Sequence, residues 1–142
     1  MACYGVAPMP LTYTIYSEAQ MLFIRAQGAV TQPERIQTML AWLADPEYER
    51  CLDALCDFSA ATSAPKLDEL RELITLLEHR LPPKGPRKLA IVVSQPVTFG
   101  VARVFEDLIG LEGVPLQVNV FFDREAAWQW LRPAMPSPGA PT

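Results

Sequence analysis

The sequence predicts a single α/β domain, in which helices pack on a mixed, mostly parallel sheet that begins with an antiparallel hairpin. Its length of 142 residues, with 50% hydrophobic and 20% charged residues, suits one folded core and excludes a disordered chain. Stretches with strand-like patterns alternate with stretches of helical spacing in the order ββαβαβαβα. Helices that separate successive strands imply right-handed parallel crossovers, so we expect the later part of the sheet to be parallel.

The first two elements form the expected hairpin. Apolar and more polar residues alternate over 11–16, which is typical of a half-buried strand. A second strand is predicted over 21–26, and residues 17–20 between the two strands are few enough for a hairpin turn. Gly28 then ends the strand pattern.

A helix is expected next, because Thr31 and Glu34 have the spacing of a capping box. In that motif the threonine hydroxyl accepts from the Glu34 amide while the glutamate side chain reaches back, and Pro33 is tolerated in the first turn. The helix is expected to end near Asp45 and Pro46. The apolar residues at core spacing are Ile36, Met39, Leu40 and Leu43.

The middle of the chain predicts two strands around a second helix. Residues 52–58 form the third strand, and the aliphatic run 89–93 forms a buried fourth strand of the kind found inside parallel sheets. The helix between them spans 66–81. Its apolar stripe consists of Leu67, Leu70, Ile74, Leu77 and Leu81.

The last third of the chain predicts a third helix, a fifth strand and a short final helix. The third helix follows Pro96, the strand covers 116–122 with Phe122 on its apolar side, and Asp123 caps the final helix. The inner face of the third helix is predicted to consist of Val101, Val104, Phe105 and Leu108.

Two tryptophans of the final helix predict an interface. Trp128 and Trp130 are separated by about 200° around the helix axis. One of them is therefore expected to be exposed unless a partner, a ligand or the C-terminal tail covers it. A homodimer is the simplest explanation.

The folded domain is expected to span residues 10–131. Residues 1–9 form an N-terminal tail, and residues 132–142 carry four of the 14 prolines. Each proline removes an amide donor and restricts φ, so the C-terminal segment is expected to be a flexible tail.

Composition excludes several classes of function. The net charge of −4 disfavours a nucleic-acid partner, and the single histidine excludes multi-histidine metal sites, so neither metal nor cofactor is expected. The longest aliphatic run has five residues, too few for a membrane span, and the first ten residues lack the features of a signal peptide. A cytoplasmic location is expected, in which Cys3, Cys51 and Cys56 are reduced thiols.

Polar residues at the carboxyl ends of the predicted parallel strands are the candidate ligand or partner contacts, because ligands of open parallel sheets bind there. They suit a small polar ligand, or they cap helices and turns. An enzyme that uses Asp57, Ser94 or Asp123 is a third alternative. The candidates are Asp57, Ser59, Ser63, Ser94, Thr98, Gly100 and Asp123.

Several short segments occur in an order that matches a known family. They are Leu22–Gly28 followed by Thr31, Leu55–Phe58, Lys88–Val93, Phe99–Arg103, Val120–Asp123 and Glu125–Leu131. Together with the order of elements, they resemble the STAS-like family (sulphate transporter and anti-sigma-factor antagonist), in particular its SpoIIAA-like group of small bacterial proteins. The fold of this group is also compared with Sec14 lipid-transfer domains.

The resemblance implies a non-enzymatic domain that acts by protein–protein interaction, as a homodimer with a regulatory role. The alternative is a small-molecule or lipid-binding carrier that uses the apolar space between the sheet and the second and third helices. Anti-sigma-factor antagonists carry Asp-Ser-Ser/Thr-Gly after the third strand, and its serine is phosphorylated. Residues 57–65 lack the Asp-Ser pair and the glycine, although Ser59, Thr62 and Ser63 lie in this region. The resemblance therefore does not extend to a phosphorylation switch.

Overall fold

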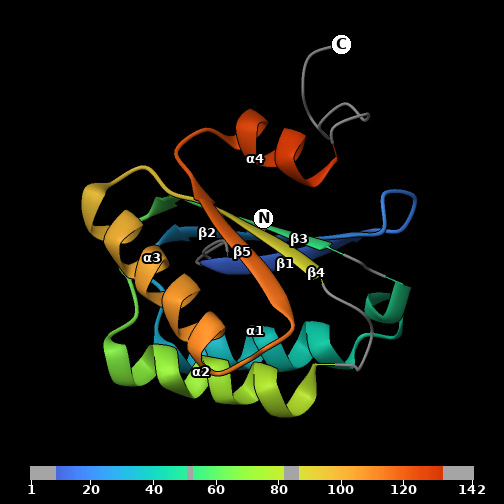
Figure 1. Cartoon of the computed structure of the whole chain (residues 1–142), viewed down its shortest axis with the longest axis horizontal. Helices are drawn as coiled ribbons and strands as arrows, with labels where there is room; N and C mark the ends of the chain where they lie inside the picture. Colours follow the sequence, from blue (N-terminus) through green and yellow to red (C-terminus); the bar gives the residue numbers. More distant parts are fainter. Residues whose placement is uncertain (1–8, 51–52, 82–86, 133–142) are drawn as a thin grey trace, which may run out of the picture.

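Five strands form one mixed sheet in the order β1-β2-β3-β4-β5 (Figure 1). The computed structural model describes residues 9–50, 53–81 and 87–132. β1 pairs antiparallel with β2, and each later pair of neighbours is parallel, which confirms the predicted fold class. The strands are β1 (Leu11–Tyr16), β2 (Met21–Gly28), β3 (Asp53–Ala61), β4 (Arg87–Val92) and β5 (Leu116–Phe121).

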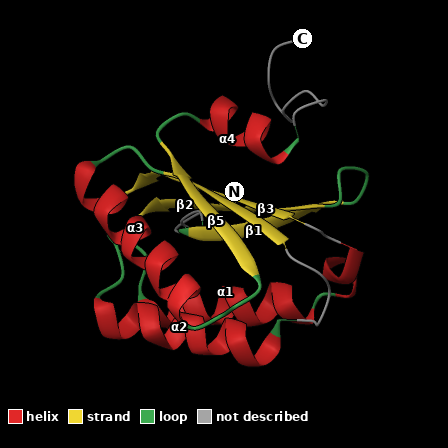
Figure 2. Ribbon diagram, viewed as in Figure 1, coloured by secondary structure: helices red, strands yellow, loops and turns green. Residues whose placement is uncertain are grey.

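Three helices cover one face of the sheet, and a fourth covers part of the other face (Figures 1 and 2). α1, α2 and α3 each connect two neighbouring parallel strands. Because the strands follow one another across the sheet in sequence order, crossovers of the same handedness place all three helices on the same face. α4 follows the last strand and packs on β3, β4 and β5 from the opposite side. The helices are α1 (Gln32–Ala44), α2 (Leu67–Arg80), α3 (Pro96–Leu111) and α4 (Arg124–Leu131), and a 3-10 turn, η1 (Pro46–Arg50), follows α1. None of the helices in these ranges is long and apolar enough to cross a membrane.

Both predicted helix caps form. The Glu34 amide donates to the Thr31 hydroxyl at 3.3 Å, and the Thr31 amide donates to the Glu34 carboxylate at 2.8 Å. Asp123 accepts from the amides of Glu125 at 3.3 Å and Ala126 at 3.2 Å. These contacts fix where α1 and α4 begin.

β2 and β3 are longer than the sequence pattern predicts. After a register shift at Arg25 and Gln27, Gly28 pairs with Ala61, so β2 does not end at residue 26 and β3 does not end at residue 58. Gly28 has φ +72°, a left-handed conformation in which glycine is favoured. The extension depends on pairing between two distant segments, which local alternation does not reveal.

Three predicted core positions are wrong. Val104 is 41% exposed, because the buried face of α3 instead contains Ala102, Phe105, Leu108 and Ile109. Leu67 and Phe122 are 54% and 58% exposed, because Leu67 is the first residue of α2 and Phe122 lies just after β5, which ends at Phe121. The predicted tails, apart from residues 9 and 132, lie outside the described residues, as do Cys3 and Cys51.

Candidate functional site

A cavity of about 190 Å³ lies between the sheet and the layer formed by α1, α2 and α3. Its lining is mostly apolar, which is typical of sites for small apolar ligands. The sheet and the helices both contribute, with Ile24, Cys56 and Ile91 on one side and Trp42, Leu73 and Phe105 on the other.

The cavity lies under the central strand, where the sheet presents small side chains to the helices. Ala54 and Cys56 of β3 both line it. Ala54 and Phe58 are only half-buried although β3 has a neighbour on each side, whereas Leu55, which faces α4, is 1% exposed. The three-helix layer therefore leaves the middle of the sheet incompletely filled.

Burial also changes the chemistry of the thiol in this lining. Cys56 is buried, and this burial raises the pKa of its thiol to about 12. The nearby Asp57 carboxylate makes a smaller contribution in the same direction. The thiol is therefore protonated near neutral pH and behaves as a small apolar group.

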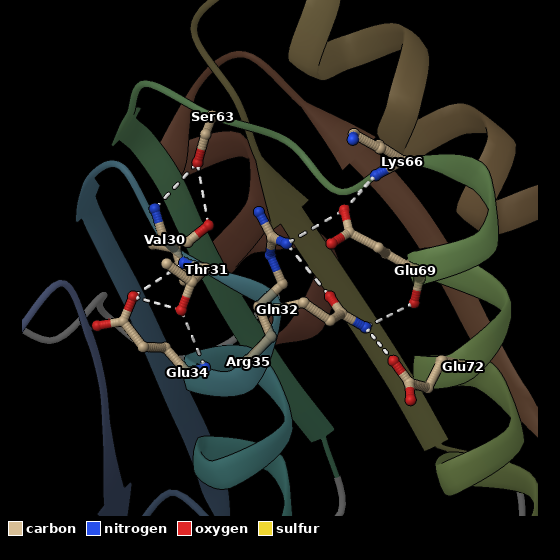
Figure 3. A network of polar contacts seen from close by, with 9 residues as sticks. All are labelled: Val30, Thr31, Gln32, Glu34, Arg35, Ser63, Lys66, Glu69 and Glu72. Atoms are coloured by element: carbon tan, nitrogen blue, oxygen red, sulfur yellow. Dashed lines mark hydrogen bonds and ion pairs between the residues drawn. The ribbon is translucent and has the colours of Figure 1, made fainter.

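One end of the cavity is bordered by a polar network at the N-termini of α1 and α2 (Figure 3). Nη1 of Arg35 donates to Oε1 of Gln32 at 3.2 Å and lies 3.8 Å from Oε1 of Glu69. Nε2 of Gln32 donates to the Glu69 carbonyl at 3.0 Å and to Oε1 of Glu72 at 2.9 Å. Gln32 thereby links α1 to α2. Burial lowers the pKa of Arg35, while the Glu69 and Glu34 carboxylates act in the opposite direction.

The same end of the cavity contains Ser63, one of the predicted site residues. Its hydroxyl accepts from the Val30 amide at 2.9 Å and donates to the Val30 carbonyl at 3.3 Å. Ser63 therefore joins the loop after β3 to the loop after β2, and both segments line the cavity.

At the other end of the strands, Tyr48 lines the cavity with a buried arginine behind it. Arg87 donates to the Tyr48 hydroxyl, and its Cζ lies 4.8 Å from the centre of the tyrosine ring. Arg87 is 3% exposed, and within the described part of the chain neither its Nε nor its Nη2 has a hydrogen-bond partner. This arginine holds the tyrosine ring in place.

The structure brings together three of the predicted site residues, Asp57, Ser59 and Ser94. Oδ1 of Asp57 accepts from the Ser59 amide at 3.1 Å and from its hydroxyl at 2.6 Å. The Ser94 hydroxyl donates to the Ser59 carbonyl at 2.7 Å. Asp57 and Ser59 lie inside β3 and not after it as the sequence predicts, because β3 continues to Ala61. The Ser94 bond joins this part of β3 to the segment that follows β4.

The other predicted site residues lie apart from this group. Thr98 lines the cavity, and its hydroxyl donates to the Gln95 carbonyl at 2.9 Å. Gly100 is exposed on α3, and Asp123 caps α4. In the described ranges, no group of three or more His, Cys, Asp or Glu side chains is placed to hold a metal ion.

Comparisons with known proteins identify the fold. No family model and no curated protein matches the sequence. An uncharacterised DUF3478-family protein from Shewanella loihica, described as having a SpoIIAA-like fold, matches with a TM-score of 0.54 and 19% identity, over 85% of this chain and 91% of that chain. An anti-sigma factor antagonist from Mycobacterium paratuberculosis matches with a TM-score of 0.53 and 19% identity, over 89% and 97% of the two chains.

This chain has a SpoIIAA-like fold. The fold expected from the STAS-like resemblance is thereby confirmed. At 19% identity, the likeness concerns the fold alone.

Within this SpoIIAA-like fold, the two tryptophans of α4 are covered differently from what the helix geometry alone predicts. Trp128 is 2% exposed, between α4 and the sheet. Trp130 is half-buried, with its ring 5.8 Å from that of Phe121 and with Nζ of Lys88 5.3 Å from its centre. Trp130 is thus partly covered by its own chain, and the dimer contact at α4 stays a prediction.

Sequence reasoning missed Arg35, which borders the cavity of the SpoIIAA-like fold. A signal was present, because Arg35 lies four residues before Met39 and seven before Trp42, on the same side of α1. Both of these apolar residues line the cavity. A basic residue within the apolar stripe of a helix is thus the sequence pattern that would have indicated Arg35.

Proposed function

We propose that this chain is a non-enzymatic binding protein that holds a small apolar ligand in the cavity beneath α1, α2 and α3. The size of the cavity, about 190 Å³, carries the proposal. An apolar pocket of this size has room for several carbon atoms, and a ligand that binds only the folded chain stabilises it.

The lining also supports ligand entry at the carboxyl ends of β2 and β3. Arg35, Ala61 and Ser63 line the cavity there, and all three are half-buried rather than fully buried. Solvent therefore reaches this part of the lining. It is the same edge at which open parallel sheets bind their ligands.

The experiment compares a cavity-filling variant with a control. Native mass spectrometry of the full chain is expected to detect a co-purified ligand, and the emptied protein is expected to bind 1-octanol in a calorimetric titration. Ala54→Leu adds three carbons at the cavity lining, so the octanol affinity is expected to fall about tenfold or more. Ala126→Leu, at an exposed position of α4, makes the same change away from the cavity and is expected to bind octanol like the wild type. Failure of the wild type to take up octanol, or equal affinity in both variants, contradicts the proposal.

A second candidate is a protein-interaction domain with a regulatory role, which forms a homodimer. An exposed apolar surface at the start of α3 favours it: Val97 is 74% exposed, Phe122 is 58% exposed, and Phe122 stacks on Phe99 with ring centres 4.9 Å apart. Grouped apolar side chains of this kind are typical of protein contacts. One fold neighbour, an anti-sigma factor antagonist, is consistent with a protein partner. A cytoplasmic location remains part of both proposals.

Light scattering of the purified protein tests the dimer. We expect a dimer for the wild type and a monomer for Val97→Asp, because a charge would be buried in the contact. Leu111→Lys changes an exposed residue at the other end of α3 and is expected to remain dimeric. Val97→Asp adds a negative charge near the N-terminus of α3, and Leu111→Lys adds a positive charge at its C-terminus. The helix dipole favours both charges, so both variants are expected to fold. A monomeric wild type contradicts this candidate, whereas a dimer that persists in Val97→Asp contradicts the contact at α3 and leaves the predicted contact at α4.

The third alternative, an enzyme that uses Asp57, Ser94 or Asp123, has the least support. The Asp57 and Ser94 side chains both bond to Ser59, while the Asp123 carboxylate bonds to the amides at the start of α4. Turnover of a generic esterase or phosphatase substrate that disappears in Asp57→Ala would favour the enzyme over a binding protein.

A further inference from the structure

The described residues that line the cavity include one charged side chain, Arg35, and no acidic one. The side chain of Arg35 is 12% exposed, so little of its surface reaches water. A buried cation is costly unless an anion and good hydrogen bonds compensate it. The charge of the lining therefore favours an anionic group on the ligand rather than a neutral or cationic one.

The present partners of Arg35 leave part of its guanidinium for such a group. Both of its polar contacts in the described residues, to Gln32 at 3.2 Å and to Glu69 at 3.8 Å, use Nη1. The distance to Glu69 exceeds that of a hydrogen bond, and the same Glu69 oxygen already accepts from the Lys66 amide at 2.9 Å. The Nε and Nη2 edge of a guanidinium matches the two oxygens of a carboxylate.

We infer that the ligand is a medium-chain monocarboxylate, with its alkyl chain in the cavity and its carboxylate on Nε and Nη2 of Arg35. The inference rests on the proposed function and names the ligand class of the same site. An apolar cavity of about 150 Å³ is known to accept benzene, so the volume here suits a chain of roughly eight carbons. The position of Arg35, at the half-buried end of the cavity, leaves the alkyl chain to extend along the apolar lining towards Tyr48.

Octanoate and 1-octanol provide the matched pair of probes, because they share a chain length and differ in charge at pH 8. Calorimetric titration of the full chain is expected to give an affinity about tenfold or more higher for octanoate, as charge-assisted hydrogen bonds imply. In Arg35→Gln this preference is expected to disappear, with octanol affinity kept within about twofold. Retained octanol binding also demonstrates that the variant is folded.

Two further variants separate the local effect from net charge. Glu69→Gln removes the competing carboxylate but keeps the oxygen that accepts from the Lys66 amide, so octanoate is expected to bind a few-fold more tightly, as a like charge is removed. Arg80→Gln, at an exposed position near the end of α2, removes the same charge as Arg35→Gln and is expected to change neither affinity.

The outcomes distinguish this inference from the proposal on which it rests. Equal wild-type affinities for octanoate and octanol, or a preference for octanoate that survives in Arg35→Gln, would overturn the carboxylate assignment while the apolar site stands. A protein that binds neither probe contradicts the proposed function itself.

Discussion

The two faces of the sheet are packed in different ways. On the α4 face, Met21, Ala90 and Ala127 have no exposed surface, and Trp128 fills the space between α4 and the sheet. On the other face, three helices bury a larger apolar cluster, yet a cavity of about 190 Å³ remains. One short helix with a large aromatic side chain thus fills its interface better than three longer helices fill theirs. The comparison indicates that the α4 face contributes stability, whereas the three-helix face retains room for a ligand.

The largest expected effect concerns the α4 face. Trp128→Ala is expected to lower the free energy of unfolding by about 3–5 kcal/mol, because it opens a cavity in a closely packed site. Met39→Ala, at a half-buried position beside the existing cavity, is expected to cost clearly less. Urea denaturation of both variants measures the difference. Equal losses would show that the two faces do not differ in packing.

The reactivity of Cys56 tests the three-helix face. Since burial raises its thiol pKa from 9.0 to about 12, the thiolate fraction at pH 8 is expected to be about a thousandfold lower than for an unperturbed thiol. Alkylation by iodoacetamide, followed in a Cys3→Ser/Cys51→Ser background, is expected to be correspondingly slow. Because the folded state favours the neutral thiol, its contribution to stability is complete below pH 9 and is lost as the pH rises towards 12. Rapid alkylation at pH 8 would show that the cavity is open to water at this residue.

The ion pair beside α4 is expected to have an intermediate effect. Asp53 accepts from the Lys88 amide at 2.8 Å and pairs with Arg132, which also donates to the Ala19 carbonyl at 2.9 Å. Asp53→Ala leaves an amide and a largely buried guanidinium without this partner, so a loss of about 2–3 kcal/mol is expected in denaturation experiments. Asp107→Ala, at an exposed position of α3, is the control, and an equal loss in both would contradict a special role for Asp53.

The smallest expected effect concerns the cap of α4. Asp123→Ala removes the acceptor of two amides and is expected to cost about 1 kcal/mol. Asp123→Asn, which keeps the acceptor oxygen, is expected to recover most of this loss in thermal denaturation. If both variants are as stable as the wild type, α4 is held by Trp128 and its neighbours alone.

Much of the fold was predictable, because the relevant signals are local. Thr31 and Glu34 are three residues apart, and the capping box forms between them as predicted. The alternation over 11–16 likewise predicts β1, whose apolar residues are half-buried and whose other residues are exposed. By contrast, the last residues of β2 and β3 were missed, because their pairing joins segments that lie far apart in the sequence.

The candidate site was less predictable than the fold. The sequence pattern places Asp57 and Ser59 after the third strand, whereas both lie inside β3, where Ser59 bonds to Asp57 and Ser94. The carrier alternative placed an apolar space between the sheet and the second and third helices. The volume and full lining of the cavity could not be predicted, because they are what remains after side chains from nine elements have packed. Arg35 acquires its position from Gln32 and Glu69, and Glu69 lies on another helix.

The sequence by itself determined the order of elements, the helix caps and the class of fold, because these depend on hydrogen bonds and periodicities within a few residues. Only the tertiary structure decided that Phe121 and Lys88 partly cover Trp130, that Val104 faces solvent and that a cavity with one arginine lies under β3. Such features depend on distances between elements, which follow from the volumes of all the side chains packed between them.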